Sequence, residues 1–306
     1  MKKSALLLFI LLAAFSARAC DICGCGAGNS YIGILPDFQK QIAGLRYRYN
    51  AIQTHVGVGG GSTYLTTSER YYIMEAWAGR NIGKNFRVMA SLPYSFNEKT
   101  NQGNTGKKNG PSDASVAGFY KLLNSRKAVG DNKLLVQSLW IGAAVKFATG
   151  KYNPEDKSAG TNNANLFQLG TGSTDFNLSA MYDVRLQDAG INVNGSYKIN
   201  TANKYEYRYG DKLSFSTQAY YKFNIKKICT LAPNAGLQYE SSKNDLDNGF
   251  RVTASGGNLL LGTLGVEASF RKIIAGANFQ TPLQQDLAKG IVKANNRMML
   301  HVGFVF

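Results

Sequence analysis

Three of the four cysteines in this 306-residue chain lie within six positions, in the stretch C-D-I-C-G-C at residues 20–25. The spacing places Cys20, Cys23 and Cys25 close enough to converge on one ion, and thiolates select Cu(I) or Zn over hard cations. We therefore predict a soft-metal site at these cysteines and no other cofactor. Two alternatives remain open: oxidation of a neighbouring pair to a disulfide in an oxidising compartment, or acylation of Cys20 as a lipid anchor.

The N-terminus has the features of a secretory signal. Lys2 and Lys3 supply a positive region, residues 6–15 are apolar, and A-R-A at 17–19 fits a cleavage site. The apolar stretch is too short to cross a bilayer as a helix. We predict a signal peptide over residues 1–19, an exported segment that carries the cysteines over 20–38, and a single further domain over 39–306.

The composition favours a large sheet for that domain. Charged residues make up only 18% of the chain, and no apolar run beyond the signal approaches the roughly 18 residues that a transmembrane helix needs. The 33 glycines, 17 tyrosines and 16 phenylalanines, against 6 prolines, are typical of long strands joined by many turns with aromatic borders. These features exclude an inner-membrane helix bundle and a disordered chain.

The hydrophobic periodicity agrees with long strands. Between residues 86 and 96 every second residue is apolar, and residues 175–185, 191–200 and 212–224 repeat this pattern. Strands of soluble sandwiches usually run about 5 to 6 residues. These segments are longer, and each could cross a bilayer at a tilt. The chain also ends on an alternating segment closed by Phe306, which resembles the C-terminal signal of bacterial outer-membrane barrels.

We predict an all-β fold: a transmembrane, antiparallel, up-and-down β-barrel of about 12 strands in the outer membrane of a Gram-negative bacterium. The last strand must pair with the first, because an open edge cannot exist in hydrocarbon. Tight turns alternate with long polar loops, which are expected over residues 51–68, 97–111, 148–172, 241–255 and 282–295. Short turns of such barrels face the periplasm, so both termini are expected there.

The polar faces of the strands provide candidates for a solute path. The side chains expected to line the lumen are Met89, Met181, Met299, His301, Arg87, Lys198, Lys222 and Arg297. Thioethers and an imidazole could relay a soft cation, although methionine also fills irregular space and a lone histidine is often simply solvated. These arginine and lysine cations outnumber the carboxylates Asp175, Asp183 and Glu267 expected on the same faces, which favours a positive lumen and acidic solutes. The net charge of +16 by itself does not select a solute. His55 lies in a glycine-rich loop and is expected to be exposed to solvent.

Three motifs carry a family resemblance. The stretches S-L-P-Y at 91–94, F-A-T-G-K-Y-N-P at 147–154 and L-G-T-G-S-T-D-F-N-L at 169–178 resemble the outer-membrane barrels grouped as "MetA pathway of phenol degradation" proteins, relatives of the FadL-type transporters. The resemblance spans most of the mature chain and implies a channel or transporter, but it names no solute. The cysteine prefix resembles a subset of such chains that begin C-D-x-C-G-C, and that likeness implies a link to copper handling.

The sequence indicates transport rather than catalysis. A Ser-His mechanism lacks a nucleophile motif such as G-x-S-x-G, and the chain has only two histidines. We predict a non-enzymatic channel or transporter for small solutes that is linked to copper through its cysteines. The expected partners are outer-membrane lipid or lipopolysaccharide, a small molecule or ion, and a periplasmic metal-handling protein, but not nucleic acid. The alternative is a structural or adhesive barrel with a closed lumen and a disulfide-bonded N-terminus.

Overall fold

A computed structural model describes residues 41–57, 61–130, 133–156, 165–226 and 228–306 of the chain. The predicted signal peptide, the 20–38 segment and the three cysteines Cys20, Cys23 and Cys25 therefore lie outside the described residues. Over the described ranges, no helix has the length and apolar character needed to cross a bilayer.

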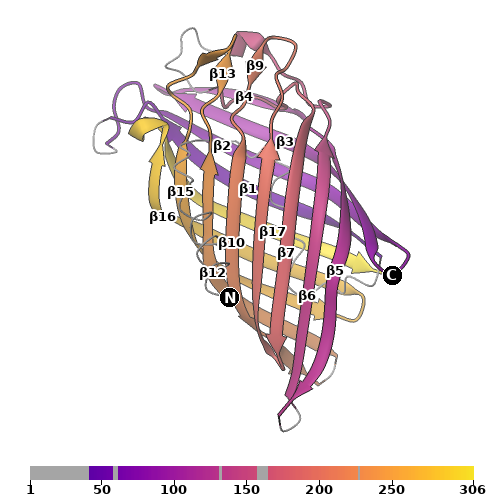
Figure 1. Ribbon diagram of the computed structural model, residues 1–306. Helices are drawn as coiled ribbons and strands as arrows, with labels where there is room; N and C mark the ends of the chain where they lie inside the picture. The colour runs from indigo at the N-terminus through magenta and orange to yellow at the C-terminus, as the bar shows by residue number, and fades with distance from the viewer. Residues whose placement is uncertain (1–40, 58–60, 131–132, 157–164, 227) are drawn as a thin grey trace, which may run out of the picture.

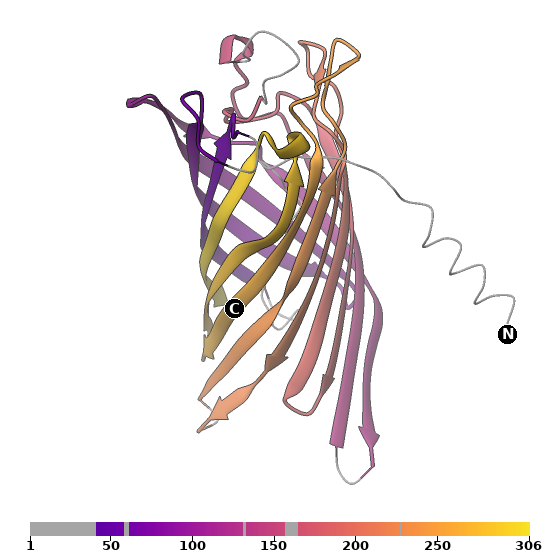
Figure 2. The ribbon, with the colours of Figure 1, turned by 90° about the vertical axis from the view of Figure 1, so that its left-hand side faces the viewer.

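The described chain forms a closed antiparallel β-barrel (Figures 1 and 2). Its wall has twelve strands. They are β1 (Ile42–Thr54), β2 (Thr67–Ile82), β3 (Phe86–Asn101), β5 (Ser115–Val129), β6 (Lys133–Lys146), β7 (Asp175–Leu186), β8 (Ala189–Ile199), β10 (Lys212–Tyr221), β12 (Cys229–Ser242), β15 (Gly257–Phe270), β16 (Ile273–Leu287) and β17 (Lys293–Val305). Neighbours in sequence pair with one another, and β1 pairs with β17, so the wall has no open edge. The predicted barrel is confirmed.

The alternation in the sequence separates two faces of this wall. Along β3, Leu92 on the outer face has an exposed fraction of 65%, whereas Arg87 on the inner face has 0%. Along β17, Phe304 is 48% exposed and His301 only 7%. Large apolar side chains therefore cover the outside of the barrel, and polar and charged ones fill much of the inside. This distribution is the inverse of that in a soluble protein and fits a wall surrounded by lipid.

The two ends of the barrel differ in their connections. Tight turns join β2 to β3, β5 to β6, β7 to β8 and β15 to β16 at one end, which also holds Ile42 and Val305. We call this the turn end and the opposite end the loop end. The short strand β11 (Phe223–Ile225) continues β10 toward the turn end. The β5–β6 hairpin reaches farthest in that direction (Figure 1).

The loops at the loop end carry secondary structure of their own. The strand β4 (Asn104–Pro111) folds back on β3 as a hairpin, and η2 (Pro154–Asp156) and η3 (Ala288–Gly290) are short 3-10 turns. Three two-residue strands, β9 (Tyr207–Arg208), β13 (Leu246–Asp247) and β14 (Phe250–Arg251), form a separate small sheet. This sheet extends the region of β10 and β12 beyond the wall (Figure 1).

Two of the predicted long loops are wrong. Residues 97–111 are mostly strand, because β3 continues to Asn101 and β4 follows it. Residues 282–295 contain only a short connection, because β16 continues to Leu287 and β17 begins at Lys293. Strand ends that project beyond a membrane need no apolar face, so their sequence loses the alternation while the backbone pairing continues.

Candidate functional site: the barrel lumen

The interior of the wall holds charged side chains in close pairs. On β1 and β2, the Arg46 guanidinium donates to the Glu75 carboxylate at 3.4 Å, and Arg48 lies 3.2 Å from the same carboxylate. The Arg46 guanidinium also lies 5.6 Å from the centre of the Trp77 ring. The two guanidinium groups thus converge on the Glu75 carboxylate.

A second ion pair crosses the interior. Arg297 on β17 donates to Glu240 on β12 at 2.8 and 3.2 Å, and Lys212 on β10 approaches the same carboxylate at 3.2 Å. The strands β15 and β16 lie between β12 and β17 in the wall. Gln280 and Gln238 make a similar contact at 2.8 Å. These side chains therefore reach one another over the inner face of the intervening strands.

Near the loop end, a buried cluster joins three wall strands to two loops. The Lys146 ammonium lies 2.6 Å from Asp113 and 2.9 Å from Asp175, and Lys198 lies 3.5 Å from Asp175. These side chains are at most 2% exposed. Asp113 also accepts the backbone N–H groups of Gly150 and Thr171, each at 2.9 Å. We call Asp113, Lys146, Asp175, Lys198 and Thr171 the clamp.

Two glycines allow the loops of the clamp to approach each other. A Cβ atom at Gly170 would lie 2.4 Å from the Asp113 carboxylate and 2.7 Å from the Cα of Gly150. A Cβ at Gly150 would lie 2.8 Å from the Cα of Gly170. Any larger residue would therefore force apart the two segments of the β6–β7 connection that carry these glycines. The motifs at 147–154 and 169–178, which lie at the two ends of the connection between β6 and β7, meet at this contact.

The loops above the clamp pack into a compact layer, which we call the lid: residues 147–156, 165–174, 200–211 and 243–256. Its apolar centre consists of Tyr152, Tyr207, Tyr209 and Val252. Burial raises the pKa of the Tyr152 phenol, which keeps the ring in its neutral form.

Hydrogen bonds connect the parts of the lid and attach it to the wall. Asn203 donates to the Thr171 carbonyl at 3.0 Å, and the Tyr209 hydroxyl donates to the Asn165 carbonyl at 3.1 Å. Asn97 on β3 donates to the Gln168 carbonyl, also at 3.1 Å. Polar contacts of this kind therefore fix the described segments of the lid to one another and to the wall.

Toward the turn end, the interior also holds a group of apolar side chains. The inward side chains Trp77, Met89, Phe119 and Trp140 are all buried and pack in one cluster with Ile42, Ala117, Ala144, Ile274 and Val305. We call this cluster the aromatic band. The Lys121 ammonium lies 5.0 Å from the centre of the Trp140 ring, where a cation is attracted by the ring face.

The residues predicted for the lumen lie at different places. Met89 belongs to the aromatic band and Met181 packs against it. Met299 and His301 lie on β17, opposite Arg48 and Arg46 in the strand register. The structure does not gather these four side chains into one site, so a soft-cation relay stays a prediction. Among the described residues, no group of three or more His, Cys, Asp or Glu side chains could hold a metal ion.

The predicted cations also have separate environments. Arg87 is fully buried beside Gly79, where an added Cβ would lie 2.8 Å from its guanidinium. Lys198 belongs to the clamp, Arg297 to the crossing ion pair, and Lys222 lies 5.3 Å from the Tyr220 ring between β10 and β11. The expectation that His55 is exposed is wrong, because this side chain is half-buried.

Sequence reasoning missed several residues that organise the lumen. The side chains of Trp77 and Trp140 point into the barrel, as the alternation along their strands requires. Both are apolar, so a search for polar strand faces does not find them. Glu75 and Glu240 occupy positions that the alternation of their strands assigns to the inner face, so the sequence could have identified them. Asp113 lies in a segment without periodicity, and its partner Thr171 is 58 residues away in sequence, so no local signal marks it.

Comparisons with known proteins agree with this architecture. No family model and no curated protein matches the sequence. Among solved structures, the COG4313 outer membrane channel from Pseudomonas putida F1 superposes with a TM-score of 0.60 at 14% identity, covering 90% of this chain and 100% of that chain. The fold is that of an outer-membrane β-barrel.

Two further structures give lower scores. The β domain of the Bordetella autotransporter BrkA has a TM-score of 0.46 at 13% identity, covering 86% of this chain and 99% of that chain. A Pseudomonas aeruginosa FadL homologue has a TM-score of 0.37 at 10% identity, covering 87% of this chain and 90% of that chain.

Proposed function

We propose that this protein is an outer-membrane channel or transporter for small solutes. The observation that carries the proposal is the inverted wall, with large apolar side chains outside and paired charges inside a sheet that closes on itself. A soluble protein would place these side chains the other way round. The fold shared with an outer-membrane channel supports the same membrane for this chain.

We also propose that the turn end and both termini face the periplasm. In barrels of the outer membrane, short turns lie on the periplasmic side and longer loops on the outer side. The tight turns, Ile42 and Val305 share one end here, and the structured loops of the lid share the other. The lid would then cover the external mouth of the channel.

The proposed solutes are anionic. In the half of the interior nearer the turn end, five cations among the described residues outnumber three carboxylates. The cations are Arg46, Arg48, Arg87, Lys121 and Lys222, and the carboxylates are Glu75, Asp183 and Glu267. Inward cations in excess of inward carboxylates lower the energy of an anion in a narrow passage. The aromatic band adds apolar surface on the same path. An anion with an apolar part would therefore find complementary groups in the lumen.

Planar-bilayer recording of the folded protein tests this proposal. We expect discrete current steps and, in a salt gradient, a reversal potential that indicates anion preference. Arg48→Glu should shift that potential toward cations, because it replaces a half-buried lumen cation with an anion. Lys127→Glu, at an exposed position near the turn end, is the matched control and should leave it unchanged. The absence of any current would favour a structural or adhesive barrel with a closed lumen.

The cysteines outside the described residues support a separate proposal. We propose that Cys20, Cys23 and Cys25 bind Cu(I) or Zn and link the barrel to copper handling through a periplasmic partner. Three soft donors at this spacing support it. Metal analysis of the purified protein beside its triple cysteine-to-serine variant is the test. We expect bound metal in the native chain and none in the variant, and equal metal content would contradict metal binding without affecting the barrel.

A further inference from the structure

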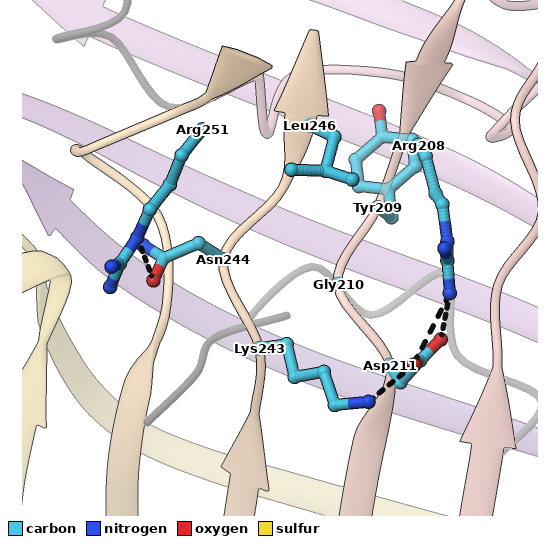
Figure 3. Close-up of a pocket in the computed structure, with 8 residues that line it drawn as sticks. All are labelled: Arg208, Tyr209, Gly210, Asp211, Lys243, Asn244, Leu246 and Arg251. Atoms are coloured by element: carbon cyan, nitrogen blue, oxygen red, sulfur yellow. Dashed lines mark hydrogen bonds and ion pairs between the residues drawn. The ribbon is translucent and has the colours of Figure 1, made fainter. Parts of the chain in front are cut away.

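The outer surface of the loop end contains a cationic cavity. Its volume is about 610 Å³, and its lining includes Arg208, Lys243, Arg251 and one carboxylate, that of Asp211 (Figure 3). Three cations against one anion leave an excess of positive charge. Small-ligand sites typically measure about 300 to 1,000 Å³, so the cavity has room for a phosphorylated sugar and not only for a bare ion.

The strand register shows that two of the cations share one face. In the small sheet, Leu246 pairs with Arg208 on one side and with Arg251 on the other. Residues directly opposite each other in antiparallel strands point to the same face of a sheet. Arg208 and Arg251 therefore flank Leu246 on a single surface, which Figure 3 shows above Lys243 and Asp211.

The cavity lies on the lipid side of the wall and not on the lumen side. Lys243 is 6.0 Å from the centre of the Tyr197 ring, and the Tyr197 hydroxyl donates to Asp211 at 3.5 Å. Tyr197 pairs with Leu178 and Leu213 in the wall, and these outward leucines are 54% and 44% exposed. The cations thus sit directly beyond the band of side chains that face the membrane.

Asp211 holds two of the cations in place. Arg208 donates to it at 3.0 Å, Lys243 at 2.9 Å, and the backbone N–H of Asn200 at 3.1 Å. Burial raises the pKa of Asp211, but these hydrogen bonds outweigh burial and leave the pKa below its usual value. Arg251 is fixed separately by a 2.7 Å hydrogen bond to Asn244. The site is therefore pre-organised, with its charges positioned before any ligand arrives.

We propose that this cavity binds the phosphorylated headgroup of an outer-leaflet glycolipid, the lipopolysaccharide of the Gram-negative outer membrane. Cations arranged just beyond a lipid-facing surface match phosphates attached to a lipid whose acyl chains contact that surface. Tyr197, Leu178 and Leu213 would contact the acyl region while Arg208, Lys243 and Arg251 bind the phosphates. The proposal rests on the sidedness given above, because that glycolipid occupies the outer leaflet.

Binding of purified lipopolysaccharide to the full chain, folded in detergent without divalent cations, tests the site. A basic residue near a membrane surface contributes about 1 kcal/mol. We therefore expect Arg251→Gln to weaken binding roughly fivefold, and Arg251→Gln with Lys243→Gln roughly 30-fold. Lys289→Gln, at an exposed loop-end cation outside the cavity, should leave affinity unchanged. Heat-dependent mobility on gels verifies that each variant is folded.

Several outcomes would overturn the proposal. These are equal affinity in the native chain and the double variant, equal binding of dephosphorylated glycolipid, or a loss in Lys289→Gln as large as in Arg251→Gln. Displacement of the glycolipid by millimolar inorganic phosphate would assign the cavity to free phosphate instead. Conductance of the native chain separates this proposal from the proposed function. Current without phosphate-dependent lipid binding contradicts only the lipid site, and phosphate-dependent lipid binding without current contradicts only the channel.

Discussion

The loop end and the turn end of the barrel are stabilised by different forces. At the loop end, the clamp and the lid are joined by ion pairs and hydrogen bonds that link segments far apart in sequence. At the turn end, the aromatic band is apolar and consists of inward side chains of the wall strands themselves. Loop contacts can break and re-form while the wall stays paired, whereas the band cannot rearrange without disturbing the strands that carry it. We therefore expect substitutions at the two ends to have separate effects.

Lys146→Met should produce the largest effect and would break the loop end selectively. The substitution leaves Asp113 and Asp175 buried without their shared cation, which costs about 3 to 5 kcal/mol of unfolding free energy. We expect the lid to loosen and the single-channel current to rise. Urea unfolding in lipid vesicles measures the stability. Lys107→Met, at an exposed pair with Glu98, is the control and should cost less than about 1 kcal/mol. An equal loss in the two variants would contradict the role of the clamp.

Trp140→Ala should weaken the turn end alone. Removing a buried tryptophan costs about 3 to 5 kcal/mol in a closed core. We expect about 3 kcal/mol, because water in the lumen can enter the vacated space. Protease cleavage of the lid should stay as in the native protein, while Trp140→Phe should lose clearly less stability. Accelerated cleavage in the lid of Trp140→Ala would show that the two ends are coupled and would contradict their independent stabilisation.

Gly170→Ala tests whether close backbone packing, in addition to the ion pairs, stabilises the clamp. Its Cβ would lie 2.4 Å from Asp113, so the loop backbone must shift. We expect a cost of about 2 kcal/mol, within the range for overpacking a close contact. Gly106→Ala is the matched control, since its Cβ has no neighbour closer than 3.9 Å. Equal melting temperatures for these two variants would show that the glycine contact does not hold the loops together.

Asp211→Asn should produce the smallest effect and a defined pH dependence. Because the folded pKa of Asp211 lies below its usual value, the carboxylate adds stability above the unfolded pKa, and this stability is lost as pH falls through the folded pKa. Its partners are partly exposed, so we expect at most about 1 kcal/mol at neutral pH. Unfolding at pH 7 and at acidic pH measures the difference, which should shrink on acidification. A constant difference would contradict the charge interaction.

The wall could be predicted from sequence because lipid on one side and polar groups on the other impose a period of two. Leu92 and Arg87 illustrate this, as does the terminal strand from Met298 to Phe306. In β2 the signal weakens, since inward Tyr71, Ile73 and Trp77 are as apolar as the outward residues. That strand belongs partly to the aromatic band and partly to an apolar cluster near the loop end.

The lid and the clamp could not be predicted. Strands of two residues, such as β9 and β13, are too short to carry any periodicity, and their pairing depends on loops more than thirty positions apart. Asp113 and Thr171 meet only after the barrel closes. The motifs at 147–154 and 169–178 did mark the region, but the reason for their glycines is a contact between the two ends of the β6–β7 connection.

The inverted wall can be tested most directly with the two native tryptophans, since both lie on the inner face and are 4% exposed. Their fluorescence should be quenched only weakly when the protein is folded into vesicles of lipids brominated on the acyl chains. In a Trp77→Phe, Trp140→Phe background, Leu92→Trp places one tryptophan on the outer face and should be quenched strongly. Native tryptophans quenched as strongly as the one in the Leu92→Trp variant would contradict the assignment of the two faces and the enclosed lumen.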